Sequence, residues 1–160
     1  MATGPPRPER VSPEWRARAL ADLMTEISPR LLADLRASGA LSGAGTDAVQ
    51  LEWDAVALHA CIRGVAAAGA RDDDTANLVD AFHDLLLPRL ATARELASLR
   101  AHLARRYAEY DGITRTLGRD GAARVPSAIA AAFAKHVGVE GAALAERAEE
   151  YYSTAIRIDP

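Results

Sequence analysis

Residues 50–69 read QLEWDAVALHACIRGVAAAG, and this stretch decides the fold. Projected as an α-helix at about 100° per residue, it has two opposite apolar sides. One side carries the larger residues Leu51, Leu58, Ile62 and Val65, and the other carries Trp53, Ala57, Ala60, Gly64 and Ala68. A helix that is apolar on two opposite sides is packed on both. We therefore expect it to run through the middle of the molecule, or of a dimer, with Leu58, Ala60 and Ile62 almost fully buried.

The composition of the chain bounds its class. A chain of 160 residues that is 49% apolar and 26% charged can bury a core without a disulfide or a metal. Its formal net charge of -3 argues against nucleic acid or an anionic membrane as a partner, because both require a basic face. The single cysteine, Cys61, excludes an internal disulfide, and we expect it to be a small core residue. No apolar run reaches about 18 residues, so no membrane span is expected.

The remaining sequence predicts further helices on either side of this central one. Residues 1–11 are rich in proline, where a secretion signal would need an apolar core, so we expect a disordered tail and a cytoplasmic location. Apolar residues then recur at helical spacing, and no stretch has the pattern of a strand. The predicted helices cover about 13–37, 46–68, 72–88, 92–112, 126–137 and 141–155. The sequence thus predicts an all-α, single-domain helical bundle of five to seven helices over residues 12–160.

Local signals place several helix ends. Ser12 is an expected N-cap, and Pro29 predicts a kink or a break near Ser28. Thr92 and Glu95 fit a capping box at the start of the fourth helix. That helix is expected to end near residues 111–112, unless residues 113–117 extend it.

A narrow polar strip lies between the apolar sides of the central helix. Glu52, His59 and Arg63 project within about 40° of one another. One interpretation is a polar ligand site, in which Arg63 binds an anionic group, His59 carries a proton and Glu52 orients one of them. The alternatives are a solvent-facing side of the helix or a structural network. If the strip is internal, we expect Arg63 to form an ion pair with Glu52 or with an acid of a neighbouring helix.

Two further candidates come from the third and fourth helices. Asp80 and His83 have the spacing that places two metal ligands on one helix face. A carboxylate-rich metal site needs more ligands, for which Glu52 and Glu109 are the available glutamates, and the alternative is a surface Asp–His pair. Tyr107 could hold a flat ligand or supply a hydroxyl to the polar strip, although tyrosines at helical spacing are commonly core-edge residues.

Two function classes remain open. The first is a non-catalytic interaction or assembly protein that acts through a homodimer or a protein partner, favoured by the two-sided central helix and by the lack of a complete catalytic constellation. The second is a bundle that binds a small ligand or a metal, with or without enzymatic activity, around Glu52, His59, Arg63, Asp80 and His83. The sequence indicates no cofactor. The two classes differ in whether His59 and His83 point into one enclosed cavity or out to water.

Overall fold

The computed structural model describes residues 12–68, 73–91, 95–139 and 142–156 of the chain. These ranges form six α-helices and one short 3-10 helix. They are α1 (Pro13–Ala37), α2 (Thr46–Ala68), α3 (Asp73–Leu90), α4 (Leu96–Leu117), η2 (Ala122–Arg124), α5 (Val125–His136) and α6 (Ala142–Ile156). The described ranges contain no strand, so the predicted all-α bundle of five to seven helices is confirmed. The predicted tail, residues 1–11, lies outside them.

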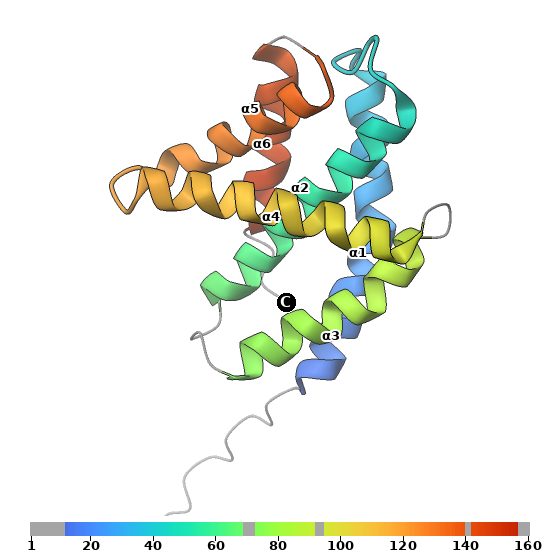
Figure 1. Ribbon diagram of the computed structural model, residues 1–160, viewed down its shortest axis with the longest axis vertical. Helices are drawn as coiled ribbons and strands as arrows, with labels where there is room; N and C mark the ends of the chain where they lie inside the picture. The colour runs from blue at the N-terminus through green and yellow to red at the C-terminus, as the bar shows by residue number, and fades with distance from the viewer. Residues whose placement is uncertain (1–11, 69–72, 92–94, 140–141, 157–160) are drawn as a thin grey trace, which may run out of the picture.

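Helix α2 is the central element of the bundle. It contacts each of the other five α-helices. In Figure 1, α4 crosses in front of α2, α1 and α3 lie side by side on one flank, and α5 and α6 form a pair on another. Helices α3 and α4 meet at one end and diverge toward the other (Figure 1). The prediction that the stretch 50–69 runs through the middle of the molecule therefore holds.

The burial of α2 differs along its length. Leu58 and Ala60 are 1% and 0% exposed, as predicted. The prediction for Ile62 is wrong, because this residue packs against the core but remains partly accessible. The neighbouring helices cover less of α2 toward its C-terminal end, where Ala67 and Ala68 are exposed. The helical projection shows the side on which a residue lies but not how far the covering helices extend.

Helix α1 continues through its internal proline. The Ser12 hydroxyl accepts a hydrogen bond from the Trp15 backbone N–H, which confirms the predicted N-cap. Helix α1 runs past Pro29 as one element, so a break near Ser28 is excluded. At this turn the Trp53 indole N–H of α2 donates to both the carbonyl and the hydroxyl oxygen of Ser28, at 3.1 and 2.9 Å. This contact joins α1 to the central helix.

Helix α4 extends beyond its expected end at residues 111–112. It continues to Leu117 without a defect, because the apolar residues Ile113 and Leu117 pack against the core. Gly118 then ends the helix with φ at +62°, a conformation that favours glycine. At the other end Glu95 is the N-cap, while Thr92 of the predicted capping box lies outside the described residues.

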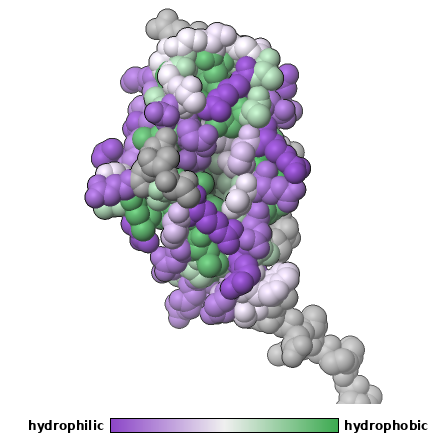
Figure 2. Space-filling view, turned by 90° about the vertical axis from the view of Figure 1, so that its right-hand side faces the viewer, coloured by the Kyte–Doolittle hydropathy of each residue, from purple (hydrophilic) through white to green (hydrophobic). Residues whose placement is uncertain are grey.

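Charged and polar side chains cover most of the surface shown in Figure 2, and apolar residues appear between them in small areas. Among the described residues, Trp15 near the start of α1 is a large apolar side chain that is mostly exposed, with an exposed fraction of 63%. No described helix combines the length and the hydropathy that a bilayer span requires.

Candidate functional site

The polar strip of α2 does not form one site. Glu52 turns toward α4, where it accepts two hydrogen bonds from Arg106: Nε donates to Oε2 at 2.6 Å and Nη2 donates to Oε1 at 2.7 Å. The glutamate side chain is 8% exposed and the arginine 19%, so the pair is largely buried. A paired arrangement of this kind is the strongest form of ion pair that arginine makes with a carboxylate. The bond to Glu52 is the main cause that raises the pKa of Arg106.

The predicted ion pair of Arg63 is therefore wrong, since the partner of Glu52 is Arg106. Glu52 and Arg63 are eleven residues apart on one helix, which separates them by about 16 Å along its axis at about 1.5 Å per residue. A projection down the axis hides this separation. Arg63 instead donates to the Thr114 hydroxyl at 3.0 Å, and no ion pair of Arg63 occurs among the described residues.

The Glu52–Arg106 pair belongs to a larger group that we call the charged cluster: Glu52, His102, Arg106, Glu109 and His136. Arg106 also contacts Glu109 at 3.2 Å, and both carboxylate oxygens of Glu109 lie 2.9 Å from His136 Nε2. His102 Nε2 lies 3.5 Å from Glu52, and burial lowers the pKa of His102. The contacts of Arg106 and Glu109 thus join α2 to α4 and α5, whereas the buried Nε2 of His102 makes no hydrogen bond among the described residues.

His59 lies in a second buried group, on the side of α2 that faces α4 and α6. Its Nδ1 is 2.8 Å from the Tyr152 hydroxyl and its Nε2 is 3.3 Å from Asp111 Oδ1. A carboxylate can only accept, so Nε2 carries the hydrogen and Nδ1 accepts from Tyr152. Burial is the main cause that lowers the pKa of His59. The imidazole is neutral at pH 7 and has a fixed tautomer.

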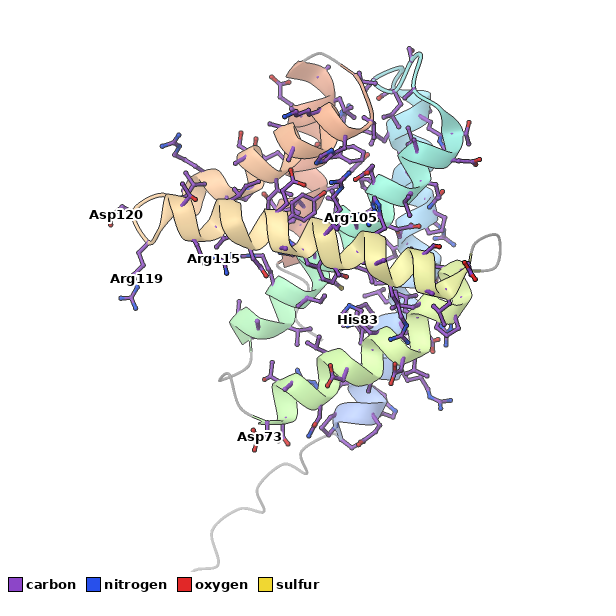
Figure 3. The ribbon with its side chains drawn as sticks, in the orientation of Figure 1. Asp73, His83, Arg105, Arg115, Arg119 and Asp120 are labelled. Carbon is purple, nitrogen blue, oxygen red and sulfur yellow. The ribbon has the colours of Figure 1, made fainter. Side chains whose placement is uncertain are left out.

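The third helix places His83 beside Tyr107. Figure 3 shows His83 between α3 and α4, and its Nε2 lies 3.1 Å from the Tyr107 hydroxyl. Asp80 and Tyr107 line an open groove of about 400 Å³ there, together with Arg100 and Asp84, which form an ion pair at 3.4 Å. His59 is enclosed, whereas His83 borders this open groove. The two histidines are linked by Tyr107, whose ring centroid is 5.8 Å from each imidazole.

The predicted metal pair, Asp80 and His83, finds no further ligands in the part of the chain that is described. No group of three or more His, Cys, Asp or Glu side chains within it is arranged so that it could hold a metal ion. The two glutamates that could have completed the site, Glu52 and Glu109, are both engaged with Arg106. Cys61 is buried, as predicted, and burial raises the pKa of its thiol to about 12.

A cavity of about 150 Å³ lies between α1, α2 and α6, and the sequence did not lead us to it. Its wall contains mainly apolar side chains: Leu23, Met24, Ile27, Leu31, Trp53, Val56, Ala57, Ala60, Tyr151 and Tyr152, with Ser28 and Thr154. Leu23, Ile27 and Tyr151 are partly exposed at its rim. The signal in the sequence was the small-residue side of α2. We expected this side to be closely packed, whereas Ala57 and Ala60 leave space there.

The protein is thus a helical bundle with a charged cluster on one side of its central helix and an apolar cavity on another. No protein-family model, curated protein or solved structure matches the chain.

Proposed function

We propose that the protein is a non-enzymatic bundle that binds a small molecule in the cavity between α1, α2 and α6. One observation carries the proposal: the cavity has a volume of about 150 Å³ and an almost entirely apolar wall. Protein interiors are close-packed, so a gap of this size leaves its lining without contacts. A ligand that fills it restores those contacts and stabilises the folded state.

The polar residues of α2 support a structural role instead. Glu52 and Arg106 satisfy each other, and His59 is held between Asp111 and Tyr152. These side chains are occupied by one another, although Asp111 itself is 57% exposed. The polar site that we expected on the central helix is therefore replaced in this proposal by the apolar cavity.

The proposal includes the expected cytoplasmic location, because the buried free thiol of Cys61 suits a reducing compartment.

Filling the cavity tests the proposal. The variant Ala57→Leu places a larger side chain in the cavity wall, and Ala131→Leu makes the same change at an exposed position of α5. We would screen both variants and the unchanged protein by ligand-observed NMR against small fragments, charged and neutral, cyclic and linear. We expect at least one fragment to bind the protein and Ala131→Leu, with binding to Ala57→Leu at least tenfold weaker. If no fragment binds, or if Ala57→Leu binds equally well, the proposal fails.

A second candidate function is self-association, and the exposure of Trp15 favours it. This side chain is 63% exposed near the start of α1, and large apolar side chains at a surface are typical of interaction sites. Homodimers are the commonest closed oligomers. Light scattering at micromolar concentrations should then give the mass of a dimer, and that of a monomer for Trp15→Ser. A monomer mass for the unchanged protein removes this candidate.

A further inference from the structure

We infer that the ligand of the cavity between α1, α2 and α6 is an uncharged, apolar molecule about the size of one six-membered ring. This inference rests on the proposed function and narrows it to a ligand class. Among the described residues, none of the side chains that line the cavity is ionisable at neutral pH. An ionised ligand would therefore leave water without a counter-charge in the wall, which is strongly unfavourable.

The polar groups of the wall already have partners. The Trp53 indole N–H donates to Ser28, and the Thr154 hydroxyl donates to the carbonyl oxygen of Glu150 at 2.9 Å. Of these groups, only the hydroxyls of Ser28 and Thr154, both accessible to solvent, could still bond a polar ligand, because a hydroxyl has one donor and two acceptor sites. Elsewhere in the wall a polar ligand group would lose its water partners without gaining others, which disfavours it against an apolar group of the same shape.

The Tyr152 hydroxyl also has a partner outside the cavity. Its ring lines the cavity, while its hydroxyl lies 2.8 Å from His59 Nδ1. Because Nε2 of this imidazole donates to Asp111, Nδ1 must accept the hydrogen of the Tyr152 hydroxyl. The chain from Asp111 through His59 to Tyr152 thus directs the hydroxyl away from the ligand, and the cavity receives only the apolar ring.

The volume sets the size of the ligand. A dry apolar cavity of about 150 Å³ in a protein interior is known to admit benzene, and the volume here is the same, about 150 Å³. Trp53 and Tyr151 meet nearly at right angles, with ring centroids 5.8 Å apart, so aromatic rings contribute to the wall. Aromatic rings favour this edge-to-face geometry with a further ring. A single ring with one or two small substituents matches this volume, and because the cavity opens at Leu23, Ile27 and Tyr151, a larger ring would protrude into solvent.

The experiment uses Trp53 as the reporter, because the chain has two tryptophans and Trp53 lies in the cavity wall. In the full-length variant Trp15→Phe, all tryptophan emission comes from Trp53. We would titrate this variant with benzene and toluene, with benzoate and benzylamine as charged rings of similar size, and with naphthalene as a larger ring. The same titrations in Trp15→Phe/Ala57→Leu and Trp15→Phe/Ala131→Leu provide the filled cavity and its matched control.

We expect benzene and toluene to change the Trp53 emission saturably and to raise Tm. At a free ligand concentration tenfold above Kd the rise is roughly 3–6 °C. Benzoate, benzylamine and naphthalene should bind at least tenfold more weakly, and Ala57→Leu should abolish the effects of benzene and toluene while Ala131→Leu preserves them. Binding of a charged or larger ring that is lost in Ala57→Leu overturns the ligand class but keeps the proposed function. If no compound binds in the cavity, both the ligand class and the proposed function are overturned. Should Ala57→Leu fail to fold, the presence or absence of a rise in Tm with benzene and toluene decides between these outcomes.

Discussion

Two sides of α2 differ in how the space beside the helix is filled. Toward α4 and α5, long charged side chains meet in the charged cluster, and Glu52 is bonded twice to Arg106. Toward α1 and α6, the small residues Ala57 and Ala60 leave a cavity of about 150 Å³. The side that is conspicuous in the sequence is the one that long charged side chains fill in the structure. The side that is inconspicuous in the sequence is the one with room for a ligand.

The largest effect is expected from breaking the charged side. Arg106→Met leaves Glu52 buried without its counter-charge, so we expect the free energy of unfolding in urea to fall by about 3 kcal/mol. Arg105→Met changes an exposed neighbour, labelled in Figure 3, and should stay within about 0.5 kcal/mol. Equal losses in the two variants would mean that the ion pair contributes nothing.

Overpacking compares two positions of α2 directly. Gly64 is buried, so Gly64→Leu has to displace its neighbours and should lower the free energy of unfolding by about 1–3 kcal/mol. Ala57→Leu adds volume where a cavity exists and should leave stability unchanged or raise it. Thermal melts of both variants test this contrast. An unchanged Tm for Gly64→Leu would place that residue at solvent.

Acidification should weaken the fold through His59, His83 and His102. Burial lowers the pKa of His59, His83 and His102 below the ordinary value of 6.5. The unfolded chain therefore binds protons at a higher pH than the folded protein does. The free energy of unfolding should be greatest above pH 6.5 and should fall as the pH drops below it, by about 1.4 kcal/mol per pH unit for each histidine until its folded pKa is reached.

Urea titrations between about pH 8 and about pH 5 measure this slope, with the unfolded reference set by ordinary histidine pKa values. A flat profile down to about pH 5.5 would show that the three imidazoles are protonated equally well in the folded protein.

The smallest effects come from a pair of tyrosines. Tyr152→Phe removes the donor to His59 and should lower the free energy of unfolding by about 1 kcal/mol. The hydroxyl of Tyr110 is buried and has no hydrogen-bond partner among the described residues, so Tyr110→Phe should be neutral or stabilising by up to about 1 kcal/mol. In chemical denaturation, the free energy of unfolding of Tyr110→Phe should therefore exceed that of Tyr152→Phe by at least about 1 kcal/mol.

Helical periodicity was sufficient to predict the fold. The spacing of apolar residues located all six α-helices, and the two apolar sides of residues 50–69 placed α2 at the centre. Periodicity describes one helix at a time, so it could not identify which helices face each other. That is why we expected Arg63 to pair with Glu52 or with an acid of a neighbouring helix, whereas the partner of Glu52 is Arg106, 54 residues away in the sequence. The cavity was not predictable for a related reason: the small residues of α2 mark the side on which it lies, but whether a neighbouring helix fills that space depends on the distance between the helices.

The turn of α1 at Pro29 has a consequence for the kinetics of ligand exchange. Proline has no backbone N–H, so the carbonyl of Thr25 loses its donor within the helix. The hydrogen-bond ladder of α1 is thus interrupted along the stretch from Leu23 to Leu31, which forms one wall of the cavity. Regions with fewer hydrogen bonds open before the whole protein unfolds. Opening of this turn would widen the rim of the cavity, where Leu23 and Ile27 are already partly exposed, and would so speed the entry and release of a molecule.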